Sequence, residues 1–156
     1  MLFRSEARLD APFAVLVHGD FNLDNVIFNP KTGRIHFIDL HRTRDSDYVQ
    51  DVSVHLASIF RLPAFDSQAR EKINTFALDF FRFARSYADS QGDATFQARL
   101  ALGLARALYT STRFEFDAHF ANAMRLRAMY LLKRLALQPP RPWTEFRFPD
   151  QILIYW

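Results

Sequence analysis

The chain has 156 residues, of which 49% are hydrophobic and 24% charged, and its formal net charge is +3. This length and composition are typical of one globular domain with a sizeable core, so intrinsic disorder, collagen and coiled-coil arrays are excluded. Because the chain has no cysteine, a disulfide scaffold, a zinc finger and a cysteine nucleophile are also excluded, and the mild basicity alone does not indicate nucleic-acid binding.

The segment 13–38 is rich in β-branched and aromatic residues and predicts three short strands. The first covers residues 13–17 and is followed by a polar loop. The other two, residues 26–28 and 34–38, are separated by the turn sequence Asn-Pro-Lys-Thr-Gly. Proline and glycine in such a cluster favour a tight connection, so we expect these two strands to form a β-hairpin.

After the hairpin the hydrophobic pattern takes the period of a helix. Four helices are expected, at approximately residues 48–61, 67–87, 95–114 and 118–137, with Asp66 or Ser67 as cap of the second and Asp117 as cap of the fourth. The tail from residue 138 is rich in proline and predicts irregular structure. The sequence therefore predicts one α+β domain over residues 1–156, mostly helical, with a helical subdomain at about 47–137 and an irregular tail at 138–156.

The polar loop before the hairpin carries the pattern H-x-D-x-x-x-x-N, formed by His18, Asp20 and Asn25. If the hairpin turn centres on residues 31–33, Asn25 lies opposite Asp39, with Cα atoms roughly 4.5–5.5 Å apart. Two hard oxygen ligands that converge in this way suit Mg²⁺, and Asp20 is placed to accept a proton from a hydroxyl. This is the arrangement of a phosphotransferase. The alternative is a polar loop whose Asn and Asp side chains only form turns.

Three segments resemble the aminoglycoside phosphotransferase and choline kinase family, whose members are relatives of protein kinases. Residues 18–25 (HGDFNLDN) resemble the catalytic loop, residues 37–40 (FIDL) the metal-binding segment, and residues 47–53 (DYVQDVS) a segment that follows it in the family. The resemblance implies the mostly helical C-terminal lobe of a protein-kinase-like fold. It also implies the roles of five residues: Asp20 as catalytic base, Asn25 and Asp39 as magnesium ligands, and His18 and Asp51 as hydrogen-bonding supports of the catalytic loop.

Other polar residues near the loop leave alternatives open. Asn22 and Asp24 either contact the substrate or only shape the turn. Arg42 and Arg44 either face phosphate groups or are solvated or paired with neighbours such as Asp45 and Asp47, and we favour the second interpretation. The histidines without a partner pattern are expected to be structural or at the surface: His36, His55 and His119.

A kinase of this type also needs a lobe that covers the nucleotide phosphates with a glycine-rich loop and contacts them with a strand lysine. The four glycines of this chain form no such loop motif, and no lysine precedes His18. We therefore expect that the N-terminal nucleotide-binding lobe is absent, that it belongs to the same gene or a longer chain, and that the 156 residues are inactive alone.

The resemblance implies transfer of the γ-phosphoryl group of ATP or GTP, with Mg²⁺, to a hydroxyl of a small molecule. In the family that acceptor is an aminoglycoside, choline, a sugar or an amino-acid derivative, and no motif here selects among them. A cytoplasmic protein without a membrane partner is expected, because no apolar run reaches membrane-spanning length and the N-terminus has no signal-peptide layout.

Two other functions remain open. One is a non-catalytic, kinase-like remnant or partner-binding module. The other is a basic helical face that binds nucleic acid, which we favour less because no aromatic residues are interleaved with its arginines. Such a face would use the arginines of the last two expected helices: Arg99, Arg106, Arg113, Arg125, Arg127 and Arg134.

Overall fold

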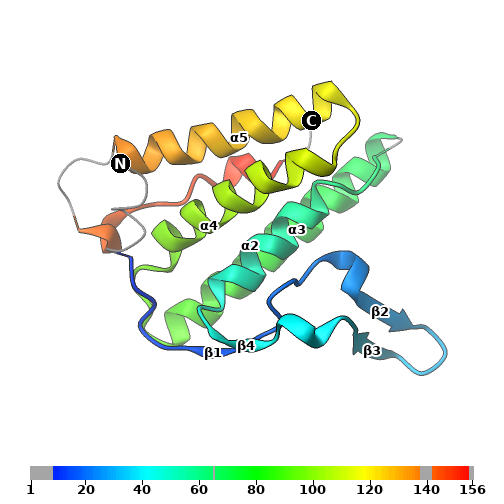
Figure 1. Cartoon of the computed structure of the whole chain (residues 1–156), viewed down its shortest axis with the longest axis horizontal. Coiled ribbons are helices and arrows are strands. Elements are labelled where there is room, and N and C mark those ends of the chain that lie inside the picture. The colour runs from blue at the N-terminus through cyan, green and yellow to red at the C-terminus, as the bar shows by residue number, and fades with distance from the viewer. Residues whose placement is uncertain (1–8, 65, 138–141, 155–156) are drawn as a thin grey trace.

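The computed structural model of the chain describes residues 9–64, 66–137 and 142–154. Four helices dominate it (Figure 1): α2 (Val49–Ile59), α3 (Ser67–Ser90), α4 (Phe96–Ser111) and α5 (Ala118–Ala136). The prediction of a mostly helical α+β chain with a small hairpin is confirmed, and the helices begin within a residue of their expected positions. None of the helices in the described part of the chain is both long and apolar enough to cross a membrane.

Two of the helices begin at the predicted caps. The carboxylate of Asp66 accepts a hydrogen bond of 2.7 Å from the backbone N–H of Ala69 at the start of α3. The carboxylate of Asp117 accepts bonds from the N–H groups of His119 and Phe120 at the start of α5. Each aspartate satisfies N–H groups that have no partner inside the helix, which fixes where the helix begins.

Four short strands form two separate antiparallel pairs. Strand β1 (Val15–Val17) pairs with β4 (Arg44–Ser46), and β2 (Val26–Asn29) pairs with β3 (Arg34–Phe37). The sequence does not predict β4, because a strand of arginine, aspartate and serine lacks the β-branched and aromatic residues typical of strands. Figure 1 shows the β2–β3 hairpin projecting from one end of the molecule, beyond the helices.

The hairpin register differs by one residue from the predicted register. Asn29 lies opposite Arg34, so the connection is a four-residue loop and not a turn centred on residue 32. Gly33 closes this loop with φ of +67°, and its N–H donates to the carbonyl of Asn29 at 2.8 Å. Glycine adopts this left-handed conformation without strain. The residue types of the turn are compatible with either loop length, so the sequence did not distinguish the two.

The shift in register corrects the expected pairing of Asn25. It lies opposite Ile38, whose N–H donates to the Asn25 carbonyl at 3.1 Å, and not opposite Asp39. Because side chains alternate across a strand, a shift of one residue changes which side chains share a face. One face of the hairpin therefore carries only apolar side chains, namely Val26, Phe28, Ile35 and Phe37.

The core lies between α2, α4 and α5, with α4 in contact with both of the others. Leu56, Leu104 and Leu131, one from each helix, are 0% exposed. Full burial of such a side chain contributes about 1.5–3 kcal/mol relative to leaving it in water. Gly103 lets α4 approach α2 closely, because an added Cβ would overlap the hydroxyl of Ser53.

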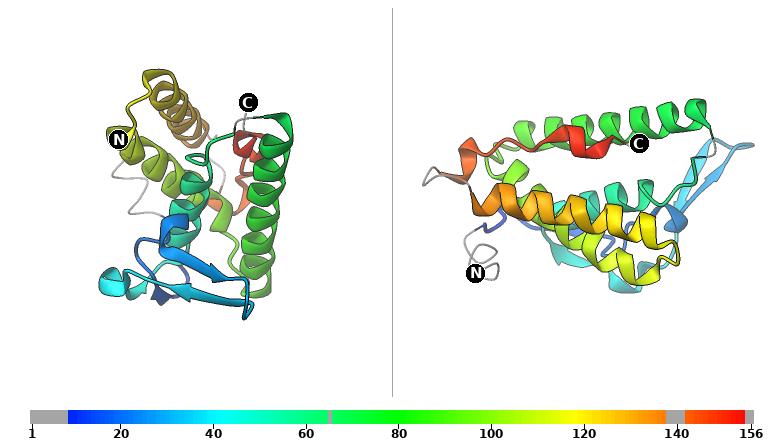
Figure 2. Two further views of the ribbon diagram at one scale, coloured as in Figure 1. Left: turned by 90° about the vertical axis from the view of Figure 1, so that its right-hand side faces the viewer. Right: turned by 90° about the horizontal axis from the view of Figure 1, so that it is seen from above.

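The last described segment packs back on the helices (Figure 2). It contains only two short 3₁₀-helices, Trp143–Glu145 and Asp150–Leu153. Phe148 is buried, and its ring centroid lies 5.1 Å from that of Phe81 in α3. Residues 138–141 and 155–156 of the expected tail lie outside the described residues.

A buried ionic cluster joins α4 to the segment before α2 and to the loop after α3. Arg99 of α4 is 4% exposed and forms ion pairs with Asp47 and Asp93. Burial alone would raise the pKa of the Asp93 carboxyl, but hydrogen bonds from Arg99 and Tyr48 outweigh burial and lower it. A buried Arg99 cannot contribute to a surface that binds nucleic acid, so that part of the basic face proposed from the sequence is wrong.

Candidate active site

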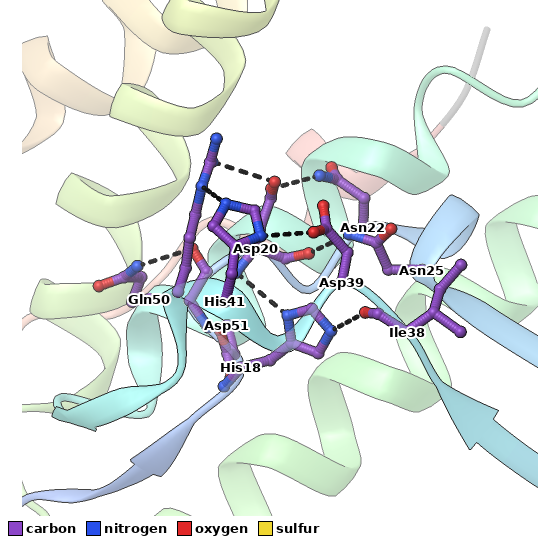
Figure 3. A network of polar contacts seen from close by, with 11 residues as sticks. His18, Asp20, Asn22, Asn25, Ile38, Asp39, His41, Gln50 and Asp51 are labelled. Carbon is purple, nitrogen blue, oxygen red and sulfur yellow. Dashed lines mark hydrogen bonds and ion pairs between the residues drawn. The ribbon is translucent and has the colours of Figure 1, made fainter.

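The loop at residues 18–25 is attached to the first turn of α2 through Asp51. One carboxylate oxygen of Asp51 accepts a hydrogen bond from the backbone N–H of His18 at 2.6 Å, and the other accepts from Gly19 at 3.0 Å (Figure 3). The side-chain amide of Gln50 also donates to the carbonyl of Gly19, at 3.2 Å. The start of the loop is therefore fixed by a helix that is itself largely buried.

Gly19 allows the loop to pass directly against the segment after the hairpin. Its φ is +83°, a conformation that strains any other residue. A Cβ added to Gly19 would overlap the backbone carbonyl oxygen of Arg42. The glycine in this loop is therefore explained by close approach as well as by its conformation.

His18 connects the loop to the end of the hairpin. Its Nδ1 accepts a bond of 3.3 Å from the backbone N–H of Asp20, and its Nε2 lies 2.8 Å from the carbonyl oxygen of Ile38. This pattern assigns the proton to Nε2, which donates to Ile38. The imidazole thus joins the residue that precedes Asp39 to the loop that carries Asp20.

Asp20 lies at the centre of the polar contacts in Figure 3. Its carboxylate accepts a bond of 2.5 Å from the side-chain amide of Asn22 and one of 3.0 Å from the guanidinium of Arg42. Its backbone carbonyl accepts a bond of 2.8 Å from Nδ2 of Asn25. A carboxylate offers about four acceptor positions, so Asp20 retains the capacity to accept a further hydroxyl proton.

Asp39 follows β3 and is the only non-glycine residue with positive φ in the described part of the chain, with φ 60° and ψ 49°. Aspartate adopts this left-handed conformation more readily than most residues, at a cost of about 1–2 kcal/mol. Its carboxylate contacts Nδ1 of His41 at 2.5 Å, and Nε2 of His41 accepts a bond of 3.3 Å from Arg42. Contacts therefore run from Asp39 through His41 and Arg42 to Asp20, and the turn, not strand pairing, directs Asp39 toward the loop.

Asn25 and Asp39 carry the oxygen atoms that best fit a magnesium ion. Because Nδ2 of Asn25 donates to Asp20, its Oδ1 is the atom that remains for a ligand. Carboxylate and amide oxygens are the donors that Mg²⁺ prefers. No group of three or more His, Cys, Asp or Glu side chains in the described residues could hold a metal. By the chemistry of their oxygen atoms, Asn25 and Asp39 are the residues of the site that could hold a magnesium ion, with the remaining ligands supplied by phosphate and water.

Asp20 and Asn22 line a cleft with a volume of ≈ 470 Å³, which is large enough for a small molecule. It lies between the loop, α2, and the end of α4 with the 3₁₀-turn that follows it (Thr112–Phe114). The other lining residues are Gly19, Arg42, Val54, Ala57, Arg61, Ala107, Thr110, Ser111, Arg113 and Phe114. A hydroxyl compound bound here would lie against the Asp20 carboxylate.

The remaining residues singled out in the sequence have other positions. Arg42 pairs with Asp20, and Arg44 donates to Gln50 at 3.0 Å, so the partners of these two exposed arginines differ from Asp45 and Asp47, the examples suggested by the sequence. Asp24 is exposed and does not line the cleft. Of the three histidines outside the loop, His55 is buried, whereas His36 and His119 are exposed.

Several residues of the site carry no signal that sequence reasoning uses. His41 and Gln50 contact Asp39 and the catalytic loop directly, yet His41 lies just outside the segments that resemble the family, and Gln50 lies inside one of them without being singled out. Arg61 and Arg113 come from the turn after α2 and the turn after α4, and only the fold brings them to the cleft. Both arginines are far from Asp20 along the chain, so the sequence did not indicate that they line the same cleft.

Comparison with known proteins identifies a family. The model of the phosphotransferase enzyme family matches residues 3–114, which include the loop, the hairpin, α2, α3 and α4. No curated protein and no solved structure matches the chain. All the site residues predicted from the sequence lie inside the matched region.

Proposed function

Because the chain belongs to the phosphotransferase enzyme family, we propose that it forms the C-terminal lobe of a kinase that phosphorylates a hydroxyl of a small molecule. The observation that carries this proposal is the position of Asp20. It faces the cleft, its backbone is bonded to Asn25, and its carboxylate is bonded to Arg42, which leads on to Asp39. A base and two metal-type ligands are thereby held in one polar cluster, as phosphoryl transfer requires.

Asp20 acts as the general base in this proposal. The oxygen of the acceptor hydroxyl forms a bond to the γ-phosphorus of ATP, or of GTP, while the bond from that phosphorus to the β–γ bridging oxygen breaks. The hydroxyl proton moves to the carboxylate of Asp20, and the nucleoside diphosphate leaves. Asn22 and Arg42 keep the carboxylate turned toward the cleft through their hydrogen bonds.

Asn25 and Asp39 would hold Mg²⁺ in the assembled enzyme. When bound, the ion neutralises the charge that develops on the phosphate oxygens. Asp51 and His18 position the loop, because they bond its first residues and the end of the hairpin and do not face the cleft. Their contribution is to hold the loop that carries Asp20 against α2 and against the end of the hairpin that precedes Asp39.

The nucleotide-binding lobe is proposed to come from a polypeptide segment other than these 156 residues. The apolar face of the hairpin offers a surface against which it could pack: Phe28, Ile35 and Phe37 are 59%, 58% and 52% exposed. The same face supports a second candidate function, a non-catalytic module that binds a partner protein there. The two candidates differ in whether the completed protein turns over ATP.

The test reads the coding sequence upstream of Met1 and expresses it together with residues 1–156. We expect it to encode a glycine-rich turn and a strand lysine, and the longer protein to release ADP from ATP and Mg²⁺ in the presence of an alcohol acceptor. Calorimetry should show poor ATP binding by the 156-residue chain alone. Low-micromolar ATP affinity of that chain would contradict the need for a second lobe. A two-lobed protein that releases no ADP with any alcohol would favour the partner-binding module.

A further inference from the structure

The cleft beside Asp20 is rich in arginine. Arg42, Arg61 and Arg113 line it, whereas Asp20 is the only acidic residue among the described residues of its lining. Asp20 is itself paired with Arg42 at 3.0 Å. The lining therefore carries an excess of positive charge even when Asp20 is ionised.

Two of these arginines have donor groups that remain available. Arg61 uses its Nε to pair with Glu115 at 2.9 Å, which leaves its two terminal nitrogens for a ligand. The guanidinium of Arg113 lies over the ring of Phe114, with its carbon 4.6 Å from the ring centroid. A cation–π contact of this kind holds the guanidinium beside the ring while its N–H groups stay available to bind a carboxylate or a phosphate.

The hydroxyls of Thr110 and Ser111, which also line the cleft, are placed to accept hydrogen bonds. Thr110 donates its hydroxyl proton to carbonyls of α4, at 2.9 Å to Arg106, and Ser111 donates to Ala107 at 2.8 Å. Because each hydroxyl has one proton to donate, both oxygens are left as acceptors. They would accept hydrogen bonds from the hydroxyl groups of a ligand.

We propose that the phosphoryl acceptor is an anionic alcohol, a compound that carries hydroxyl groups together with a carboxylate or a phosphate group. This inference rests on the proposed function, because it places the reacting hydroxyl at Asp20. Arg61 and Arg113 bind the anionic group, and Thr110 and Ser111 accept from the other hydroxyls. A cationic acceptor is disfavoured, because it would meet the arginines without an unpaired carboxylate in the described lining.

Four small probes of similar size separate the parts of this proposal. Calorimetry or NMR titration of the 156-residue chain compares glycerol 3-phosphate, glycerate, glycerol and choline. We expect at least one of the two anionic alcohols to bind about tenfold or more tightly than glycerol and choline, because charged hydrogen bonds have strengths of that order. The phosphate and carboxylate probes distinguish the two anion types, and inorganic phosphate tests whether the hydroxyls contribute.

Substitutions at Arg113 and Glu115 test whether the cleft arginines bind the anionic group. Arg113→Gln should weaken binding of the preferred anion about tenfold. The control Arg82→Gln removes the same charge from the exposed side of α3, outside the cleft, and should leave binding unchanged. Glu115→Gln should instead tighten binding, because it removes the negative charge that partly neutralises Arg61. A residue with a merely structural role would not produce this gain.

Equal binding of anionic and cationic probes would overturn the proposal, as would binding of inorganic phosphate as tight as that of glycerol 3-phosphate. Loss of binding in Arg82→Gln equal to that in Arg113→Gln would also overturn it, because the effect would then be one of net charge. The anionic acceptor and the proposed kinase function can fail independently of each other. A two-lobed protein that phosphorylates only neutral or cationic alcohols would refute the anionic acceptor and leave the kinase intact.

Discussion

The helical region and the hairpin region of this molecule are built in different ways. Residues of α2 and α4 such as Leu56 and Leu104 are fully buried, and Arg99 has its charge paired inside the core. By contrast, every residue from 31 to 45 is exposed, including Ile35 and Phe37. The candidate site lies where these two regions meet, because Asp51 comes from the helical side and Asp39 from the hairpin side (Figure 3).

This difference indicates that the helical region and the hairpin region support different residues of the site. The loop with Asp20 and Asn25 is fixed from the helical side by hydrogen bonds to Asp51 and Gln50. Asp39 is fixed mainly by its own turn and by a contact to His41, whose side chain is 63% exposed. We therefore expect substitutions on the helical side to be costly and those on the hairpin side to be mild until another surface covers the hairpin.

The largest expected effect is at Arg99. Arg99→Ala leaves the carboxylate of Asp93, whose side chain is 0% exposed, without its charged partner. Breaking a buried pair in this way destabilises a protein by about 3–5 kcal/mol. Urea denaturation measures the loss against Arg85→Ala, which removes an exposed arginine of α3. A loss equal to that of the control would mean that the ionic cluster does not hold the helical side together.

A smaller loss is expected at Asp51. Asp51→Ala leaves the N–H groups of His18 and Gly19 without their acceptor, at a cost of about 1–3 kcal/mol. Thermal denaturation of this variant is compared with that of Asp45→Ala, whose carboxylate lies on the exposed strand β4. An unchanged melting temperature would contradict the supporting role of Asp51 and show that its hydrogen bonds do not hold the loop to the helical side.

The buried imidazole of His55 makes stability depend on pH. Burial lowers the pKa of His55, and the carbonyl of Phe21 and the charge of Asp51 only partly oppose this effect. The unfolded chain, with a histidine pKa of about 6.5, therefore binds the proton first as the pH falls, and stability decreases below that pH by up to about 1.4 kcal/mol per pH unit. Unfolding measured between pH 7 and pH 5 should show this slope in His36→Gln and lose it in His55→Gln.

The smallest effect is expected on the hairpin. Phe28→Ala, at a side chain that is 59% exposed, should change stability by no more than about 0.5 kcal/mol. Phe96→Ala, at a side chain that is 2% exposed, should cost about 3–5 kcal/mol. Equal losses for the two phenylalanines in urea denaturation would show that the hairpin is part of the same core.

The sequence predicts the helical region better than the hairpin region, for physical reasons. Helix periodicity and the capping residues Asp66 and Asp117 are local signals, and the helices begin where these signals indicate. Strand register depends on the loop closed by Gly33, and a difference of one residue in loop length moves Asn25 from Asp39 to Ile38. Local patterns alone could not distinguish these two registers.

Positions that depend on long-range packing were the least predictable. The residues of the catalytic loop were found because they are close together in sequence and form a motif. Arg61 and Arg113 reach the cleft only through the packing of α2 and α4, and no local pattern separates them from surface arginines. The same packing buries Arg99, which its sequence environment suggested would be exposed.

The role of Asp20 is tested most directly by the turnover of Asp20→Asn in the two-lobed protein. Asparagine keeps the size of the side chain but cannot accept the hydroxyl proton. We expect kcat to fall about 10²–10⁴-fold with nucleotide binding nearly unchanged, while Asp45→Asn keeps the original rate. Asp39→Asn should behave differently and raise the magnesium requirement. If Asp20→Asn retains the original kcat, or if excess magnesium restores it, Asp20 is not the base and the site does not work as proposed.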